Sequence, residues 1–241
     1  MICKTADGQL QSLSKNFNYN RIEPLVENIR AYITGCKAAS LLDIGAGGPN
    51  IAIPLARLVT RYLAVEQSEE EARLLRNVDL NIICGTFPMR MNETFDLVLS
   101  CHSVPETGLD LYSNFLGSAW RLVKVNGFLL VITFKGSRGD IARLREELTG
   151  STLKNDPQFE TIVQNLSQCG PVRIERINSY ISSPYVTDIV TYISEAVFRT
   201  ERERLAHSNR LQEILHMRYR LDGQYVFPLE HLFLSVRRKK R

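Results

Sequence analysis

The sequence predicts a mixed α/β fold, a doubly wound and mostly parallel sheet of seven strands with a helical insertion between the last two. Short apolar runs alternate with longer amphipathic segments over most of the chain, which is typical of parallel strands joined by helical crossovers. The strand-like runs are almost wholly apolar, as expected for strands covered on both faces. A long, charge-rich segment of helical spacing separates the last two runs and exceeds the length of a hairpin loop.

The first half of the chain is expected to supply four strands and three helices. Asn20 is placed to cap the first helix, and Ser68 to cap the third. Pro24 and Pro54 are compatible with these helices only in a first turn. The expected helices are 20–33, 51–59 and 68–76, and the expected strands are 40–44, 62–65, 80–83 and 95–100.

The second half continues this alternation and then departs from it. We expect helices at 109–123, 140–148 and 157–169, a turn at 124–127, and strands at 128–134, 172–181 and 229–237. Between the last two strands the residues have helical spacing. The chain therefore divides into an N-terminal helical cap segment (1–38), an α/β core (39–181), a helical lid (182–228), and a final strand with a basic tail (229–241), all within one domain.

Composition and charge narrow the range of partners. The 241 residues are 44% hydrophobic and 23% charged, which suits one globular domain with an elaboration. The formal net charge is +4, but the final RRKKR (237–241) carries +5, so the rest of the chain sums to −1. The tail is either a solvated terminus or a weak contact for phosphate or anionic lipid. A nearly neutral body gives nucleic-acid binding little support.

Cysteine usage and hydropathy indicate the compartment. The five cysteines form no C-x-x-C pair and no cluster with histidine, so we expect a reduced, cytoplasmic chain without a metal site. The chain has no apolar segment typical of a signal peptide or a membrane span. We therefore expect no membrane partner.

A glycine-rich turn after the first strand is the strongest functional signal. In LLDIGAGGPN (41–50), Asp43 ends the strand, Gly45 and Gly47 form the turn, and Pro49 or Asn50 opens the next helix. Ligands of open α/β sheets bind at this edge. Glycine permits positive φ and close approach of a ligand. Glu66 ends the second strand, where a carboxylate can accept hydrogen bonds from ribose hydroxyls or from nearby backbone N–H groups.

Two cofactor classes use such a layout. A nicotinamide dinucleotide requires G-x-G-x-x-G for its pyrophosphate, and Asn50 occupies the last position of that pattern. S-adenosylmethionine carries no phosphate and requires an acidic group near its cationic end, which Asp43 fits. Over residues 32–134 the sequence resembles the class I S-adenosylmethionine-dependent methyltransferases. The resemblance rests on LLDIGAGGPN, LAVEQS, FDLVLSCHSV and LVKVNGFLLVITF, and the closing DGQYVFPLEHLFLSVRRK resembles the end of that fold.

The resemblance implies S-adenosylmethionine as cofactor. It places the turn glycines under the methionine part, Glu66 on the ribose and Gln67 along the adenine, with Asp43 ordering the loop and the ammonium end. The implied cofactor-binding set is Asp43, Gly45, Ala46, Gly47, Asn50, Glu66, Gln67, Gly85, Thr86 and Ser100. Two positions depart from the family: Pro49 replaces the usual glycine, and Thr86 replaces the aspartate that commonly binds the adenine amino group.

In this family the loop after the fourth strand faces the methyl group, and here it reads SCHSVPE (100–106). It lacks the Asn/Asp-Pro-Pro-Tyr block of methyltransferases that act on the amino groups of DNA bases. His102 is the first candidate for a general base, because imidazole titrates near neutral pH; the alternative is a histidine that only lines the pocket. Glu106 is the second candidate. Cys101 as a nucleophile would need a second cysteine to resolve the adduct, and none is placed for it.

Acceptor specificity is expected from the N-terminal segment and the lid. Tyr19, Tyr185 and Tyr192 are the aromatic candidates there, although helical spacing also explains Tyr192 as a packing residue. We expect a small or medium-sized acceptor methylated on oxygen or nitrogen. The alternatives are an RNA methyltransferase and a non-catalytic S-adenosylmethionine-binding regulatory protein. An aminopropyl transferase would carry acidic residues after the fourth strand, where this chain has Cys101, His102 and Ser103.

Overall fold

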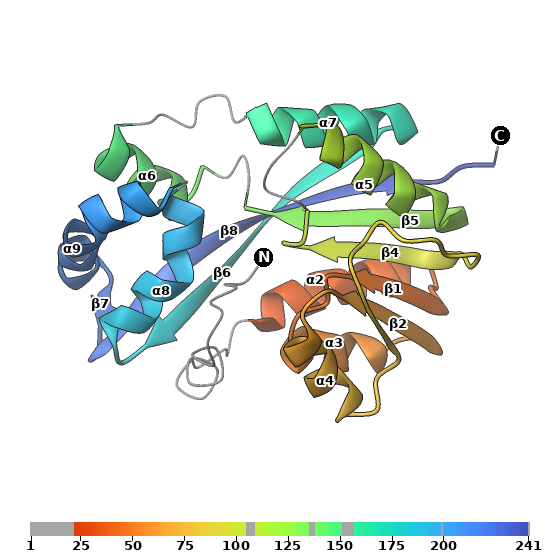
Figure 1. Ribbon diagram of the computed structural model, residues 1–241, viewed down its shortest axis with the longest axis horizontal. Helices are drawn as coiled ribbons and strands as arrows, with labels where there is room; N and C mark the ends of the chain where they lie inside the picture. Colours follow the sequence, from red (N-terminus) through yellow and green to blue (C-terminus); the bar gives the residue numbers. More distant parts are fainter. Residues whose placement is uncertain (1–21, 105–108, 135–137, 151–156, 199, 241) are drawn as a thin grey trace.

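The computed structural model describes residues 22–104, 109–134, 138–150, 157–198 and 200–240. Its centre is an eight-stranded sheet in the order β3-β2-β1-β4-β5-β8-β6, with β7 paired to β8 (Figure 1). β1 to β5 are parallel, and β8 runs antiparallel to both β5 and β6. The strand order reverses between β1 and β4, which is where ligands bind in open α/β sheets. The strands are β1 Ser40–Ile44, β2 Arg61–Glu66, β3 Ile82–Cys84, β4 Phe95–Cys101, β5 Val123–Thr133, β6 Val172–Ser183, β7 Arg220–Leu221 and β8 Gln224–Arg237.

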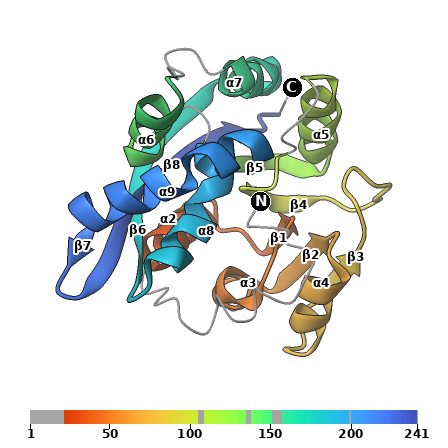
Figure 2. The same ribbon diagram turned by 60° about the vertical axis from the view of Figure 1, so that its left-hand side comes forward.

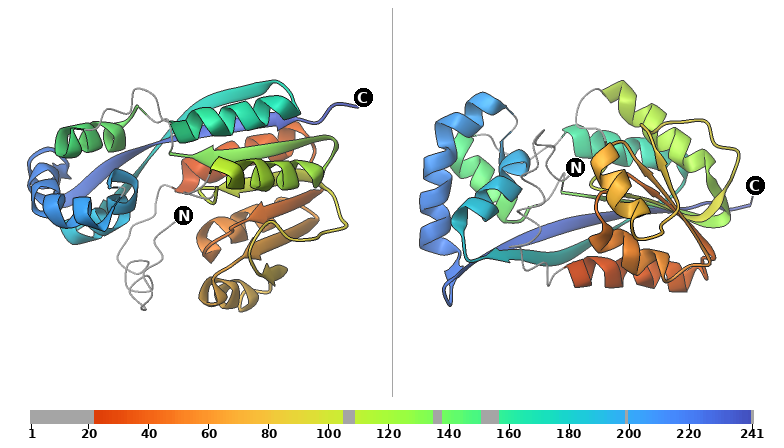
Figure 3. Two further views of the ribbon diagram at one scale, coloured as in Figure 1. Left: turned by 45° about the horizontal axis from the view of Figure 1, so that its top comes forward. Right: turned by 60° about the horizontal axis from the view of Figure 1, so that its bottom comes forward.

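Helices cover both faces of the parallel half of the sheet (Figures 1 and 3). Ile29 of α2 and Leu55 of α3 belong to the apolar core on one face, while Tyr112 of α5 and Leu166 of α7 belong to the core on the other. Ser68 caps α4 by accepting a hydrogen bond from the N–H of Glu71, as the sequence predicts. The helices are α2 Ile22–Gly35, α3 Pro49–Ala56, α4 Glu69–Arg76, α5 Leu109–Arg121, α6 Asp140–Thr149, α7 Pro157–Cys169, α8 Val186–Val197 and α9 Glu201–Arg218. None of the described helices is long and apolar enough to cross a membrane.

The outer half of the β6–β8 pair carries a third apolar core. β8 pairs with β5 only over its last residues, Leu232 to Arg237, but with β6 from Val236 back to Tyr225. The two strands therefore extend past the parallel sheet, and α6, α8 and α9 gather on this extension (Figures 2 and 3). The shared core includes Leu144, Ile193, Ile214 and Phe227. The insertion between β6 and β8 thus packs with α6, which precedes both strands in the chain.

The fold class agrees with the prediction, several boundaries differ from it by a few residues, and the starts of β8 and β5 differ most. β8 begins at Gln224 rather than at Leu229, and Pro228 lies within it, paired with Tyr180. Over this stretch β8 has no β5 partner on its other side, so a residue without an N–H is tolerated. The expected turn at 124–127 lies within the bounds of β5, which begins at Val123. The register with β4 shifts across it, from Phe95 opposite Val123 to Leu97 opposite Phe128, and Asn126 has a positive φ of 70°. Asn126 donates its N–H to the carbonyl of Arg238 (2.6 Å), so the chain end extends the pairing there.

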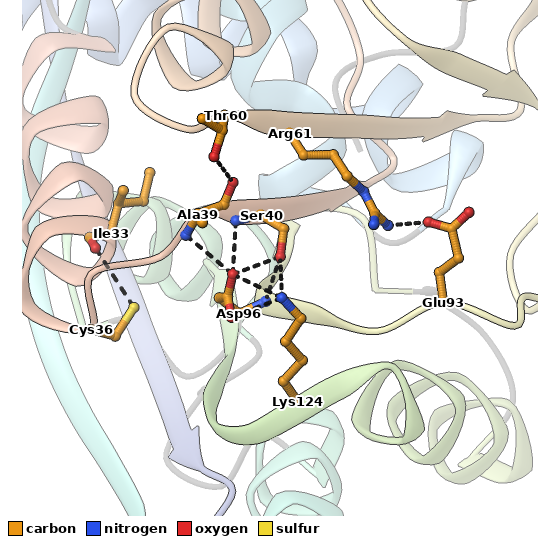
Figure 4. A network of polar contacts seen from close by, with 9 residues as sticks. All are labelled: Ile33, Cys36, Ala39, Ser40, Thr60, Arg61, Glu93, Asp96 and Lys124. Atoms are coloured by element: carbon orange, nitrogen blue, oxygen red, sulfur yellow. Dashed lines mark hydrogen bonds and ion pairs between the residues drawn. The ribbon is translucent and has the colours of Figure 1, made fainter.

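A polar network closes the amino-terminal edge of the parallel strands (Figure 4). The Asp96 carboxylate accepts hydrogen bonds from the N–H groups of Ala39 (3.1 Å) and Ser40 (2.9 Å) and from the hydroxyl of Ser40 (2.7 Å). The Lys124 ammonium lies 3.1 Å from the same carboxylate. Partial burial acts to raise the pKa of Asp96, but the bonds from Ser40 and Lys124 outweigh it and hold this pKa below its ordinary value. This network fixes the starts of β1, β4 and β5, opposite the edge that carries the site.

Candidate functional site

The loop between β1 and α3 turns on two glycines in the left-handed region. Gly45 (φ 69°) donates its N–H to the carbonyl of Val65 at 2.7 Å. A Cβ at this position would lie 2.3 Å from the Cβ of Ser103, so the missing side chain admits the loop after β4. Gly47 (φ 61°) has no atom within 4 Å of the corresponding point. The space beside Gly47 is therefore open, as a cradle for a ligand requires.

Glu66 connects this loop to the next one. One carboxylate oxygen accepts the N–H of Gly47 at 2.9 Å, and the other accepts the N–H of Ser68 at 2.8 Å. The side chain is buried at the carboxyl end of β2. A carboxylate has about four lone-pair sites, so these two bonds leave acceptor capacity for ligand hydroxyls. The two roles that the sequence leaves open for Glu66, ordering the backbone and binding a ribose, are therefore compatible.

Asp43 is buried beneath the same loop. Its carboxylate accepts a hydrogen bond from the Tyr62 hydroxyl at 2.8 Å. Burial raises the pKa of Asp43 to about 7, with a further contribution from the charge of Glu66 and an opposing one from the Tyr62 hydrogen bond. Burial and the nearby Asp43 also raise the pKa of the Cys101 thiol to about 12. Since the thiolate is the reactive form, Cys101 is poorly suited to act as a nucleophile.

A third carboxylate makes this region an acidic cluster. Glu71 has a buried oxygen, Oε2, with no hydrogen-bond partner; it lies 3.0 Å from the point where a Cβ on Gly48 would stand. Burial and the charges of Glu66 and Glu70 raise the pKa of Glu71. Within the described ranges, no arginine or lysine forms an ion pair with Asp43, Glu66 or Glu71. Uncompensated negative charge around an open glycine turn suits a cationic ligand.

The loop after β4 is held by serines at its start. The Ser100 and Ser103 hydroxyls lie 2.8 Å apart, and Ser103 donates to the carbonyl of Ile44 in β1. Ser103 was not among the sequence candidates. The only feature of the sequence that could have indicated Ser103 is its position just after a buried strand. Its role is to hold the β4 loop against the Gly45 turn.

His102 lies between these serines in a left-handed backbone conformation (φ 54°). Its N–H donates to the carbonyl of Ile132 at 2.8 Å. The imidazole stacks on Phe134, with ring centroids 3.9 Å apart and planes 19° apart. Its Nε2 lies 2.9 Å from Nδ1 of His231. Burial and the adjacent His231 hold the pKa of His102 well below its ordinary value, so this imidazole is neutral at pH 7.

The parallel half of the chain also matches a known family. Residues 42–131, from β1 through most of β5, fit a family model described as a methyltransferase domain. These residues therefore form a methyltransferase domain. A search of curated protein sequences finds no match.

Two solved structures have the fold of this methyltransferase. A putative methyltransferase from Bacillus halodurans C-125 superposes with a TM-score of 0.51 at 15% identity, over 83% of this chain and 93% of that one. The N-methyltransferase NodS from Bradyrhizobium japonicum WM9 gives 0.53 at 11% identity, over 90% of this chain and 96% of that one. At these identities the likeness shows the fold alone, and it extends beyond the cofactor half of the methyltransferase.

The remaining residues predicted for the methyltransferase site differ in their exposure and contacts. Gly85 donates its N–H to the carbonyl of Glu66 at 2.8 Å, which places it beside the acidic cluster. The side chains of Asn50, Gln67 and Thr86 are exposed, and Ala46 is partly buried in the turn. The Ser100 hydroxyl is directed to Ser103, within the protein.

Two of the predicted acceptor residues, Tyr185 and Tyr192, belong to the helical insertion. Tyr185 is 58% exposed at the start of α8, beyond the outer end of β6. Tyr192 packs against the core of the insertion, as the packing alternative for it required. Tyr19 and Glu106 lie outside the described residues. Among the described residues, no group of three or more histidine, cysteine or acidic side chains could hold a metal ion.

Proposed function

We propose that this methyltransferase acts on an oxygen or nitrogen atom of a small or medium-sized acceptor bound between the carboxyl edge of the sheet and the helical insertion. The observation that carries this proposal is the position of His102. It follows β4 directly and contacts His231 of β8, the strand that continues into the insertion. A neutral imidazole at this point can accept a proton from the acceptor. His102 is therefore the proposed general base.

The open turn and the acidic cluster fit the proposed cofactor site. When bound, S-adenosylmethionine supplies the methyl group. Gly47 provides the open surface, and Glu66 keeps unused acceptor capacity. Asp43 and Glu71 bring negative charge that matches a cationic ligand. The proposed binding residues are Asp43, Gly45, Ala46, Gly47, Asn50, Glu66, Gln67, Gly85, Thr86 and Ser100, with Glu71 added from the structure.

The helical insertion is proposed as a lid over the acceptor. Its supporting strands, β6 and β8, contribute Ser179 and His231, whose side chains meet at 2.6 Å next to His102. The insertion shares a core with α6 and the outer half of β6 and β8, separate from the cores of the parallel sheet, so these elements can move as a unit. Closing an active site excludes water and completes the arrangement of groups around the substrate.

The basic tail gives the RNA alternative little support. Nη1 of Arg238 lies 2.5 Å from the carbonyl oxygen of Val123 and 3.3 Å from those of Trp120 and Arg121. The guanidinium of Arg237 lies over the ring of Phe128, 5.6 Å from its centroid. Two of the tail's cations are thus engaged with the protein. A small acceptor is the better-supported class.

Cofactor binding is tested by calorimetric titration with S-adenosylmethionine, S-adenosylhomocysteine and NAD. We expect the first two to bind and NAD not to bind. Asp43→Ala and Glu66→Ala should each weaken binding about tenfold or more, the order of effect of a lost charged partner. Glu70→Ala is the matched control, because it removes an exposed carboxylate from the same region and should leave affinity unchanged. Binding of NAD, or unchanged affinity in both site variants, would contradict the assignment.

The acceptor class is tested by measuring S-adenosylhomocysteine release in the presence of amines, phenols and carboxylic acids, with a structured RNA transcript in parallel. We expect turnover with at least one small molecule and its loss in His102→Ala. Turnover with RNA alone would favour the nucleic-acid alternative. Cofactor binding without any turnover would favour the regulatory one.

A further inference from the structure

Three polar side chains from separate strands form a continuous chain at the proposed site. Nε2 of His102, which follows β4, lies 2.9 Å from Nδ1 of His231 in β8. Nε2 of His231 lies 2.6 Å from the hydroxyl of Ser179 in β6. Both supporting residues are buried, His231 with 3% and Ser179 with 7% of its surface exposed. Each ring nitrogen of His231 thus contacts a different neighbour, Nδ1 the imidazole of His102 and Nε2 the hydroxyl of Ser179.

The surroundings hold both rings in place. The ring of Phe134 is stacked on His102, and its centroid lies 4.9 Å from the ring centroid of His231. His102 is held in a backbone conformation that few residues other than glycine adopt. Such a conformation costs free energy and persists only where the surrounding structure fixes it, which is frequent at functional sites. The chain is therefore preorganised rather than an incidental surface contact.

We propose that Ser179 and His231 form a proton relay that serves His102 during methyl transfer. This inference rests on the proposed function, in which His102 is the base. His231 and Ser179 act through His102 and are positioning residues. The relay requires one tautomer: His102 carries its proton on Nε2 and donates it to His231, and His231 carries its proton on Nε2 and donates it to Ser179. Nδ1 of His102 then keeps a free lone pair for the acceptor.

The proton balance is complete. The acceptor's O–H or N–H bond breaks as its proton moves to Nδ1 of His102. The Nε2 proton of His102 passes to Nδ1 of His231, the Nε2 proton of His231 passes to the Ser179 oxygen, and the original hydroxyl proton of Ser179 leaves to water. One proton thus leaves the acceptor and one enters the solvent. Both imidazoles end neutral in the other tautomer. To reset them, the Nδ1 proton of His102 leaves to solvent after the product departs, while a proton from water returns through Ser179 and His231 to Nε2 of His102.

A relay suits this environment better than a single charged base. Burial lowers the pKa of His231 to about 4 and holds that of His102 well below its ordinary value. An imidazolium on either ring is therefore unfavourable. Passing the proton along the chain avoids a lasting charge on either ring.

The tautomers are measured directly by ¹⁵N NMR of histidine-labelled protein bound to S-adenosylhomocysteine. We expect Nε2–H on both His102 and His231 in the wild type. Ser179→Ala should leave His231 as a mixture of tautomers. Ser182→Ala, a buried serine on the same strand but the opposite face, should change neither ring. Nδ1–H on both rings of the wild type would overturn the relay, because the base position on His102 would be occupied.

His231→Asn separates proton transfer from simple positioning. The asparagine oxygen can accept the Nε2–H of His102 in place of Nδ1, but an amide passes no proton onward. With an acceptor found in the turnover screen, we expect His231→Asn to keep the tautomer of His102 and the affinity for S-adenosylmethionine while lowering kcat about tenfold or more, toward the size of a general-base effect. An unchanged kcat in this variant would overturn the relay. No turnover of the wild type with any acceptor would instead contradict the proposed function, and the NMR tautomers would still decide whether the chain is arranged for a relay.

Discussion

Gly45 and Gly47 look equivalent in the sequence, but the fold requires a glycine at the two positions for different physical reasons. The pattern in 41–50 predicted a glycine turn after a buried strand, and both glycines do adopt positive φ. What the sequence could not reveal is the neighbour of each. Ser103 packs against Gly45, whereas Gly47 faces open space. That difference arises from a loop distant in the chain, so it becomes visible only in the folded protein.

Alanine substitutions should separate these two roles. Gly45→Ala adds a Cβ 2.3 Å from Ser103 at a positive φ, so it should destabilise the fold by about 2–5 kcal/mol from strain and overpacking together. Gly47→Ala carries the strain alone and should cost about 1 kcal/mol, while its new methyl group enters the cradle and weakens S-adenosylmethionine binding. Chemical denaturation and calorimetric titration of both variants measure the two effects. Equal destabilisation by the two substitutions would contradict this division.

Asp43 should make both stability and cofactor affinity depend on pH. Its pKa is raised to about 7 from an ordinary 3.8. Between these values the folded protein holds a proton that the unfolded chain releases, so this group's contribution to stability falls as pH rises from about 4 to 7. A cationic cofactor favours the carboxylate. Its affinity should therefore drop about tenfold between pH 8 and pH 6 as Asp43 becomes protonated.

Asp43→Asn is the control for this titration. It cannot ionise, so its cofactor affinity should be lower than wild type at pH 8 and nearly constant down to pH 6. Calorimetry at the two pH values, with denaturation curves beside it, gives both quantities. A wild-type affinity that does not change over this range would contradict a coupling between the ionisation of Asp43 and cofactor binding.

At the scale of elements, the sequence located almost every helix and strand but misjudged where some begin. A proline usually marks a boundary, so Pro228 indicated that the last strand starts after it. Inside the fold that stretch of β8 has a partner on one side only, and the missing N–H costs little there. The composition likewise indicated a solvated basic tail. Arg238 instead reaches the last carbonyls of α5, which no pattern in RRKKR could reveal.

Arg238 should therefore stabilise the protein rather than serve a partner. The last carbonyls of a helix lack partners within the helix, and a cation there also interacts favourably with the helix dipole. Arg238→Ala should lower the free energy of unfolding by about 1–2 kcal/mol. Lys240→Ala, an exposed neighbour in the same tail, should have no measurable effect. If the two variants unfold alike, the contacts of Arg238 with α5 are not stabilising.

At the scale of the whole molecule, the described residues build three apolar cores, one on each face of the parallel half of the sheet and one on the extension of β6 and β8. The parallel half followed from its periodicity, and the glycine turn at its carboxyl edge followed from the motif in 41–50. The meeting of His102, His231 and Ser179 did not, because it depends on the register between β6 and β8 and on how far they extend past β5. The grouping of α6 with α8 and α9 was equally hidden, because these helices are separated in the chain by α7 and β6.

The insertion core and the core beneath the cofactor loop should respond differently to a cavity of the same kind. Ile214 and Leu99 are both fully buried, Ile214 in the insertion core and Leu99 in the core beneath the cofactor loop. Replacing either with alanine should cost about 2–5 kcal/mol locally. Leu99→Ala should lower hydrogen-exchange protection in the parallel sheet and weaken S-adenosylmethionine binding.

Ile214→Ala should lower protection only in α6, α8 and α9, and leave cofactor affinity within about twofold of wild type. It should also reduce methyl transfer, because the proposed lid, once loosened, would close less often over the acceptor. Hydrogen exchange, calorimetry and turnover on the same two variants distinguish the outcomes. Loss of cofactor affinity in Ile214→Ala equal to that in Leu99→Ala would mean that the cores unfold as one unit. The insertion would then stabilise the cofactor site directly instead of acting as a lid.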